Sequence, residues 1–583
     1  MKNKRLLPLL FSGLLFYACQ VQEVSTPVAE VEKEFTPYQV TFHDGRPFST
    51  GKDYSDPKGK YVAGPGGPVM MQAFYWDVPA GGTWWDNVAS KIPDWSNANI
   101  ASVWLPPASK GQGGGFTMGY DPFDYYDFGE YNQQGSLETR FGSRNELENV
   151  ITVAHAEDME VYADMVLNHN SGGDLEWNEF ANTDTWTDFN PASGLFFRSK
   201  LDFHPNDFHA NDAGSFGGFP DLCHDKTYVQ DWLWNLPNSV GKYYHDVMGF
   251  DGWRFDYVKG FDAWVVNSWN SNVGGFSVGE YWDGNAVTLN NWAQAANSSV
   301  FDFALYYRML DAFSQNDLNN LNSNDMMWKK DPFKAVTFVA NHDEDNIFDG
   351  KNLAYAYILT HEGYPCIFYR DYEEWLDKDD LDDLIYIHKW RATGNTSILY
   401  VDNDEYIARR NGWNGNSGLI VYINNSDQPQ QHTVQTNWGA GTKVMDFTFN
   451  SGWWCTTNAN GEITINVPPN GYTIWCPWPV LTAAPANTPT MDDNYPYPKD
   501  HEPGYDNGII TLGNPINFIK STEIQLTNVS NENHGVPVKI VNGSTLNVSR
   551  VLLDEPGSQY VLTIKEVNPR NGYNDKTYYI FNN

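Results

Sequence analysis

The sequence is poor in basic residues. Its 583 residues include 37 Lys and Arg against 73 Asp and Glu, which gives a formal net charge of −36. Nucleic acids and anionic membrane surfaces attract proteins mainly through lysine and arginine. The scarcity of these residues therefore argues against nucleic acid as a partner. The acidic balance favours solubility and does not by itself identify a substrate.

Long hydrophobic runs are also scarce. The run from Leu6 to Tyr17 follows three basic residues and is too short to span a bilayer. It ends at Phe16-Tyr-Ala-Cys19, which resembles a bacterial lipoprotein signal, with plain secretion as the alternative. We expect residues 1–18 to be the signal peptide and Cys19 to carry the lipid anchor. This predicts attachment to the cell envelope, at the outer membrane of a Gram-negative bacterium, with the polar residues 19–60 as a tether.

Cysteine is the third scarce residue, with five in the whole chain. Cys455 and Cys476 flank a predicted hairpin, and an exported protein folds under oxidising conditions, so we predict a disulfide between them. Cys366 lies in the apolar run Cys366-Ile-Phe-Tyr369 and is predicted to be a buried thiol.

Aromatic residues are abundant, and from Val69 onward apolar strand patterns alternate with amphipathic helix patterns. This alternation predicts a (β/α)8 TIM barrel over residues 61–395. The expected strands are Val69–Tyr75, Ala101–Leu105, Val161–Leu167, Gly252–Phe255, Phe276–Gly279, Val300–Phe303, Val336–Ala340 and Cys366–Tyr369. Trp84–Ala98, Asn145–Glu157 and Tyr228–Val247 are examples of the expected helices.

Three further regions interrupt or follow the barrel. The interval after the third strand is too long and too polar for a simple loop, so residues 168–226 are predicted to be a small inserted domain. Residues 396–478 show short alternating runs with turn signals, which predict a β-sandwich. A Pro-rich linker, 479–508, precedes a β-rich segment, 509–583, whose role as a glycan-binding module, an adhesion or export domain, or a spacer stays open.

Two acidic residues follow adjacent predicted strands. Arg254 and Asp256 are two residues apart, so both side chains point to one face of the fourth strand. Glu280 comes directly after the fifth strand, and the length between them suits a parallel pair joined by a helix. Two carboxylates that face one another across a cleft are what glycoside hydrolysis requires.

Four segments resemble the four sequence regions of glycoside hydrolase family 13, the α-amylase family. They are Asp164-Met-Val-Leu-Asn-His169, Gly252-Trp-Arg-Phe-Asp-Tyr-Val-Lys259, Val278-Gly-Glu-Tyr-Trp282 and Phe338-Val-Ala-Asn-His-Asp343. Other segments, such as Gly217-Gly-Phe-Pro-Asp-Leu-Cys223, are similar to the archaeal-type α-amylases in particular. The resemblance spans residues 65–478 and leaves the C-terminal segment uncovered.

The resemblance implies an enzyme that hydrolyses α-1,4-glucosidic bonds in starch, glycogen and related α-glucans, acting within the chain and retaining the anomeric configuration. Asp256 would be the nucleophile, Glu280 the acid and base, and Asp343 the group that stabilises the transition state. The substrate-binding residues implied are Tyr120, His169, Arg254, Lys259, Trp282 and His342. Alternatives are a transglycosylase, an enzyme that trims malto-oligosaccharides, or a non-catalytic starch-binding lipoprotein, which would lack one of the three acids. We expect a monomer.

The resemblance also implies metals. A calcium ion would be held by Asn168, Asp212 and Asp221 together with the backbone carbonyls of Gly214 and Gly260, because Ca²⁺ prefers hard oxygen ligands. His204, His209 and Cys223 match an adjacent zinc site of some relatives, and such side chains are good zinc ligands. Buried structural histidines and a free thiol are the alternative, because Ala210 and Asn211 stand where relatives carry cysteines.

Overall fold

The computed structural model describes residues 68–210, 214, 216–412, 417–448, 450–451 and 454–477, and the strands between residues 507 and 581. The predicted signal peptide, Cys19 and the tether lie outside the described residues, as does most of the predicted linker. Among the helices that are described, none combines the length and the apolar character needed to cross a lipid bilayer.

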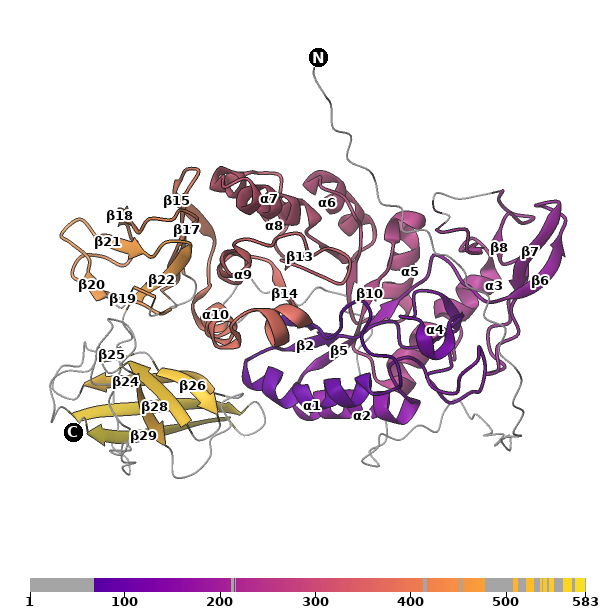
Figure 1. Ribbon diagram of the computed structural model, residues 1–583, viewed down its shortest axis with the longest axis horizontal. Helices are drawn as coiled ribbons and strands as arrows, with labels where there is room; N and C mark the ends of the chain where they lie inside the picture. The colour runs from indigo at the N-terminus through magenta and orange to yellow at the C-terminus, as the bar shows by residue number, and fades with distance from the viewer. Residues whose placement is uncertain are drawn as a thin grey trace, which may run out of the picture. The chain divides into compact units, whose positions relative to one another are not determined.

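A closed barrel of eight parallel strands forms the centre of the first described region, in the order β1-β14-β13-β12-β11-β10-β5-β2 (Figure 1). The strands are β1 Met70–Gln72, β2 Ser102–Trp104, β5 Glu160–Met165, β10 Gly252–Phe255, β11 Phe276–Gly279, β12 Ser299–Phe301, β13 Ala335–Phe338 and β14 Tyr364–Phe368. Each overlaps a strand predicted from the sequence, and the barrel is confirmed. Almost every strand residue is buried, as expected when helices cover a parallel sheet.

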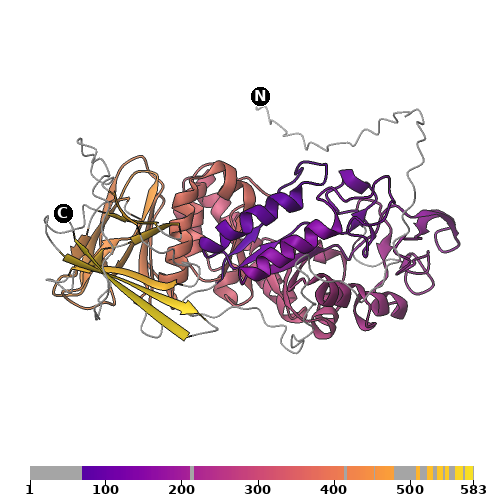
Figure 2. The same ribbon diagram turned by 90° about the horizontal axis from the view of Figure 1, so that it is seen from below.

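Helices alternate with these strands. They include α1 Trp84–Asn97, α2 Arg144–Ala156, α5 Ala263–Asn272, α6 Ala286–Ala295, α7 Phe303–Ser314, α8 Met327–Lys330, α9 Lys351–Thr360 and α10 Lys378–Arg391. Figure 2 shows α1 and α2 side by side. Helix α2 begins with a capping box in which Ser143 and Glu146 satisfy free backbone N–H groups, so its start is readable from the sequence.

The predicted helix Tyr228–Val247 is broken in the structure. It consists of α3 Thr227–Gln230, which continues into the π-helical turn η2 Asp231–Asn235, and α4 Val240–Lys242, which continues into η3 Tyr243–Met248. Pro237 explains the break, because proline lacks a backbone N–H and disfavours helical geometry in the residue before it. Leu236 accordingly has the extended values φ −63° and ψ 153°.

Two hairpins form between β5 and α3, within the region predicted as an insert. They pair β6 Asp174–Asn178 with β7 Thr183–Asp188, and β8 Phe203–His204 with β9 Asp221–Leu222. Another hairpin, β3 Lys110–Gly111 with β4 Pro122–Asp124, follows strand β2.

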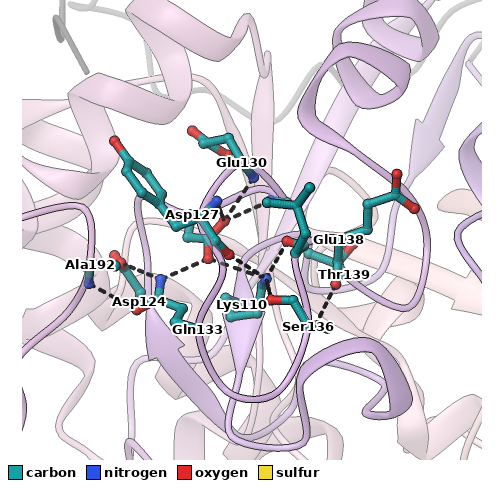
Figure 3. Close-up of polar contacts among 12 residues, drawn as sticks. Lys110, Asp124, Asp127, Glu130, Gln133, Ser136, Glu138, Thr139 and Ala192 are labelled. Carbon is teal, nitrogen blue, oxygen red and sulfur yellow. Dashed lines mark hydrogen bonds and ion pairs between the residues drawn. The ribbon is translucent and has the colours of Figure 1, made fainter. Parts of the chain in front are cut away.

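A buried lysine anchors the β3–β4 hairpin. The Lys110 ammonium lies 3.3 Å from Asp127 Oδ2, and both side chains are fully buried. It also donates to the backbone carbonyl of Ser136 at 3.1 Å (Figure 3). Gln133 Nε2 donates to Asp127 Oδ2 at 2.7 Å and to Asp124 Oδ2 at 2.9 Å. The loop that carries Tyr120 therefore rests on a charged network with little access to water.

Replacing Lys110 by methionine is expected to lower the melting temperature by several degrees. The Asp127 carboxylate would stay buried without its cation, and breaking a buried pair in this way typically destabilises by about 3–5 kcal/mol. Lys226→Met is the control, because Lys226 pairs with the half-exposed Asp207 and such pairs contribute about 1 kcal/mol or less. Equal melting temperatures of the two variants would contradict a structural role for the Lys110 network.

The predicted β-sandwich is confirmed after the barrel. A six-stranded antiparallel sheet, β15-β16-β17-β22-β19-β20, packs with the two-stranded sheet β18-β21 around one apolar core that includes Ile407, Tyr422, Ile465 and Trp475. The strands are β15 Thr396–Val401, β16 Glu405–Arg410, β17 Leu419–Asn424, β18 Gln430–Gln435, β19 Lys443–Asp446, β20 Trp454–Thr456, β21 Glu462–Val467 and β22 Gly471–Pro477.

The predicted disulfide between Cys455 and Cys476 is wrong, since both thiols are free. Cys455 pairs with Val444 and Cys476 pairs with Met445, so strand β19 lies between the two cysteine strands. Two strand spacings amount to about 10 Å, whereas a disulfide needs Cα atoms within about 7 Å. Cys366 is a buried free thiol, as predicted.

The C-terminal segment is β-rich, as predicted. It forms a three-stranded antiparallel sheet, β23-β27-β26, and a four-stranded antiparallel sheet, β25-β24-β28-β29. The strands are β23 Asn507–Thr511, β24 Ser521–Asn528, β25 Gly535–Val536, β26 Val538–Asn542, β27 Thr545–Ser549, β28 Gln559–Asn568 and β29 Gly572–Phe581.

Candidate active site

The predicted catalytic acids follow the carboxyl ends of barrel strands, where enzymes with this fold carry their active sites. Asp256 and Glu280 come directly after β10 and β11, and Asp343 follows β13. Arg254 pairs in register with Asp164 on β5 and with Val278 on β11. The parallel register therefore brings charged side chains from neighbouring strands to the same level of the barrel.

The Arg254 guanidinium contacts three carboxylates. Its Nη1 lies 2.9 Å from Asp164 Oδ1 and 2.8 Å from Asp256 Oδ1, and its Nη2 lies 2.8 Å from Glu280 Oε1. The arginine is buried. Because one planar group holds both Asp256 and Glu280, their carboxylates lie near each other on one side of the barrel mouth. Close pairing of this kind is typical of retaining glycosidases, whose carboxyl groups are about 5–5.5 Å apart.

Burial raises the pKa of three acids at this site, Glu280, Asp343 and Asp164. It raises the pKa of Glu280 to about 8, although the nearby Arg254 charge lowers it. Burial likewise raises the pKa of Asp343 to about 6 and that of Asp164 to about 7, again against the effect of Arg254. Glu280 therefore holds a proton at neutral pH and can donate it, which is the property required of a general acid.

The residue after Asp256 adopts a rare backbone conformation. Tyr257 has φ 43° and ψ 47°, in the left-handed region that non-glycine residues seldom occupy. Its N–H donates to Glu280 Oε2 at 3.0 Å. The strained turn thus orients the second oxygen of Glu280, and strain of this kind is concentrated at functional sites.

An aromatic stack lies beside the acids. The Tyr120 hydroxyl donates to Asp164 Oδ2 at 2.8 Å. The Tyr120 ring is stacked with that of His342, with centroids 5.3 Å apart and planes inclined by 10°. Trp76 stacks with both rings and is about half exposed. These rings offer apolar faces against which a sugar ring can pack.

His342 is neutral and orients Asp343. Burial holds the pKa of His342 well below its usual value. Gln72 Nε2 lies 2.9 Å from His342 Nδ1, so this nitrogen accepts and the proton resides on Nε2. His342 Nε2 in turn lies 3.2 Å from Asp343 Oδ2, and Asn341 Oδ1 accepts the Asp343 N–H at 2.8 Å. Asp343 is therefore positioned by neighbours on both sides.

The other predicted substrate residues are less directly connected to the acids. His169 is fully buried, and its Nε2 lies 3.0 Å from the Tyr120 carbonyl. Lys259 Nζ lies 3.3 Å from Asp283 Oδ2. Trp282 Nε1 donates to the Tyr307 hydroxyl at 2.7 Å, and the Trp282 side chain is partly exposed.

Sequence reasoning missed three residues at the site. Asp164 accepts from both Tyr120 and Arg254, and Trp104 Nε1 donates to Asp164 Oδ2 at 3.1 Å. Trp76 is the third. Asp164 opens one of the four family-like segments, and Trp76 follows the first strand. Because active-site residues of this fold lie at the carboxyl ends of strands, both could have been predicted from their positions in the sequence.

Part of the predicted calcium site fits a cation. Asn168 Oδ1 and Asp221 Oδ1 are buried and have no hydrogen-bond partner within the described part of the chain. A Cβ at Gly260 would lie 1.9 Å from Asn168 Oδ1, and one at Gly214 would lie 2.3 Å from the Gly260 carbonyl oxygen. Oxygen atoms of the kind that Ca²⁺ prefers are thus close together, and the Gly214 carbonyl accepts from Asn168 Nδ2 at 2.9 Å. Asp212 lies outside the described residues.

The predicted zinc ligands His204, His209 and Cys223 do not form one cluster in the described part of the chain. Within the described ranges, no three His, Cys, Asp or Glu side chains form a group that could hold a metal. His204 Nδ1 lies 3.3 Å from Asp221 Oδ2, and the more exposed His209 pairs with Asp225 at 3.1 Å. Cys223 is a buried free thiol. Zinc-bound histidines commonly pair their second ring nitrogen with a carboxylate, so both zinc binding and the alternative of structural histidines with a free thiol fit these contacts, and the zinc site stays a prediction.

Comparisons with known proteins agree with this arrangement. A family model described as Alpha-amylase C-terminal matches residues 419–476. The α-amylase of Geobacillus stearothermophilus is 30% identical over 493 residues, which cover 71% of this chain and 88% of that protein. The cytoplasmic α-amylase of Escherichia coli K12 is 28% identical, covering 70% of this chain and 98% of that protein.

A solved Anoxybacillus α-amylase structure shares the fold with a TM-score of 0.56, at 18% identity, and the match covers 72% of this chain and 99% of that one. The relatives found are bacterial and plant proteins, which do not support the archaeal-type subgroup. The barrel, the C-terminal sandwich and the extent of the match to the Geobacillus protein lead to one conclusion. This chain belongs to the α-amylase family, glycoside hydrolase family 13.

Proposed function

We propose that this enzyme hydrolyses α-1,4-glucosidic bonds within starch, glycogen and related α-glucans and retains the anomeric configuration. The observation that carries the proposal is the shared contact of Asp256 and Glu280 with Arg254. Within this pair, burial leaves Glu280 protonated at neutral pH. A nucleophile and a proton donor are thus available side by side.

In the proposed mechanism, Asp256 attacks the anomeric carbon while Glu280 gives its proton to the departing glycosidic oxygen. A covalent glycosyl-enzyme forms, and the first part of the glucan leaves. Glu280, now ionised, takes a proton from water, whose oxygen attacks the anomeric carbon and frees Asp256. Asp343 stabilises the positive charge that develops on the sugar, and Tyr120 packs against the ring.

Product analysis on soluble starch tests this reaction against its alternatives. Cleavage within chains lowers iodine staining quickly and releases oligosaccharides of mixed length. One dominant short product formed without early loss of staining would favour a trimming enzyme, and lengthened or cyclic products would favour a transglycosylase. The presence of all three acids disfavours the non-catalytic alternative. A non-catalytic protein would release no reducing sugar from starch.

The pH dependence of kcat/KM should show an alkaline decline that begins near pH 8. Glu280 must be protonated to act as the acid, so activity is lost as pH rises through its raised pKa of about 8. A 4-nitrophenyl malto-oligoside, whose leaving group needs little protonation, should show a weaker decline. An alkaline limb already below pH 6 on starch would contradict the assignment of Glu280.

We also propose a structural calcium ion held by Asn168, Asp221 and the carbonyls of Gly214 and Gly260, with Asp212 as a further ligand. When bound, this ion supplies positive charge that satisfies the buried oxygens. Gly260 follows Asp256 closely in the chain, so the ion would link the insert to the strand that carries the nucleophile.

Chelation should therefore lower both the melting temperature and the activity, because a ligand that binds only the folded state stabilises it by mass action. Calcium should restore both properties better than magnesium, which requires a smaller octahedral site. Asn168→Ala should melt at a lower temperature and respond less to chelator. An unchanged melting temperature after exhaustive dialysis against chelator would rule the site out.

The lipid anchor at Cys19, the outer-membrane location and the monomeric state remain predictions from the sequence. The anchor and the outer-membrane location agree with a role at the cell surface, where large α-glucans are accessible.

A further inference from the structure

The β6–β7 hairpin has its apolar and polar faces reversed. Asn178 and Thr187 are 1% and 3% exposed, whereas Leu175, Trp177 and Trp186 are 51%, 54% and 60% exposed. A hairpin on a protein surface normally turns its apolar side chains inward and its polar side chains outward. Figure 1 shows the two strands as a separate pair within the insert.

Hydrogen bonds satisfy the inward polar face. The Thr187 hydroxyl donates to Glu176 Oε1 at 2.9 Å, and the Lys200 N–H donates to the same oxygen at 2.5 Å. Asn178 Oδ1 accepts from the N–H groups of Phe180 and Ala181 at 2.9 and 3.1 Å. The hairpin is therefore held by polar contacts, and the exposed tryptophans contribute little to its stability. Exposed apolar clusters of this kind mark interaction sites.

The strand register places the two indoles on one face. Trp177 lies opposite Asp184, and Asn178 lies opposite Thr183. Because side chains alternate along a strand, Trp186 shares the outward face with Asp184. Trp186 is thus a diagonal neighbour of Trp177, and such neighbours lie about 7–8 Å apart. Two large rings and an exposed carboxylate form one platform.

The chemistry of this platform suits a neutral polyhydroxylated ligand. Indole faces pack against the apolar C–H faces of sugar rings, and the Asp184 carboxylate can accept hydrogen bonds from hydroxyl groups. The net charge of −36 disfavours anionic ligands. The hairpin is joined to other parts of the insert, through Lys200 and Pro205.

We propose that Trp177 and Trp186 form a second α-glucan-binding site, on the β6–β7 hairpin of the insert, that holds polymeric or granular substrate near the enzyme. This rests on the proposed function for the identity of the glucan. The site requires no chemistry of its own, and it would raise the local concentration of chain segments available to the cleft.

Adsorption to starch granules tests the site. Every protein carries Glu280→Gln so that the granules stay intact, and the test protein adds Trp177→Ala and Trp186→Ala. We expect the Kd for granules to rise about tenfold or more, because central aromatic residues dominate most binding surfaces. Phe333→Ala is the matched control, an exposed aromatic outside the hairpin, and it should leave the Kd unchanged. None of the proteins should adsorb to microcrystalline cellulose.

Several results would overturn the proposal. An unchanged granule Kd in the double tryptophan variant, or an equal change in the Phe333 control, would do so. A change in molecular mass by light scattering would assign the platform to contact between copies of the chain instead. If the double variant folds poorly, Trp186→Ala alone should still raise the Kd severalfold. If the wild-type enzyme releases sugar from soluble starch but the double tryptophan variant adsorbs to granules as before, only the second site is refuted. If the wild-type enzyme releases no sugar, the proposed function is refuted.

Discussion

Replacing Glu280 by glutamine is expected to lower kcat on soluble starch by about 10²–10⁴-fold, the usual contribution of a positioned acid or base. Glutamine has nearly the same shape and its side-chain oxygen can still accept the Tyr257 N–H. It cannot, however, transfer a proton to the glycosidic oxygen. Binding of oligosaccharides should therefore be retained, which calorimetry with a maltooligosaccharide would show.

Glu160→Gln is a matched control for this variant. Glu160 begins strand β5, at the end of the barrel opposite the acids, and it accepts from the Tyr162 hydroxyl at 2.8 Å. Residues at that end serve stability in this fold, so its kcat should stay near that of the wild type. If Glu280→Gln kept activity within about tenfold of the wild type, another group would have to be the acid.

Replacing Arg254 by methionine is expected to have the second large effect, on stability and turnover together. The substitution leaves the buried carboxyls of Asp164, Asp256 and Glu280 without their common cation. Removing one partner of a buried ion pair costs about 3–5 kcal/mol. It would also raise the pKa of Glu280 further, because Arg254 is the charge that lowers it. We expect a lower melting temperature and a kcat reduced by at least about 10²-fold, as for the loss of a positioned catalytic group.

Arg254→Lys separates the charge from the geometry of the guanidinium. Lysine keeps the positive charge but cannot reach three carboxylates with a planar fork. It should therefore recover part of the melting temperature and little of the activity. Arg308→Met, which removes a half-exposed arginine 3.4 Å from Asp325, should change stability by about 1 kcal/mol or less. A wild-type melting temperature for Arg254→Met would show that the acids do not depend on this cation.

Predictions that depend on local pattern agree with the structure. The eight strands were predicted because a parallel strand that is buried on both sides needs a short apolar run, and such runs are visible in the sequence. The helix predicted over Asn145–Glu157 is found as α2, Arg144–Ala156, and its start carries a capping box of Ser143 and Glu146. The helix over Tyr228–Val247 failed because its amphipathic pattern continues across Pro237, whereas the backbone cannot.

Predictions that depend on distant contacts fared differently. The predicted disulfide was wrong because strand β19 lies between β20 and β22. The order of strands in a sheet depends on contacts between distant segments, so the local pattern of the sequence does not give it. The carboxylate partners of His204 and His209, which are Asp221 and Asp225, could likewise not be identified from spacing alone.

The sequence by itself determined the family and the barrel and indicated three candidate acids that follow barrel strands, because strand periodicity and motif order are local properties of the chain. Only the tertiary structure decided that one buried guanidinium joins Asp164, Asp256 and Glu280, that Trp76 completes the aromatic stack, and that two tryptophans face solvent on the β6–β7 hairpin. Burial and through-space charge arise when strands distant in sequence are brought side by side. The proton held by Glu280 follows from that environment, and therefore from the fold.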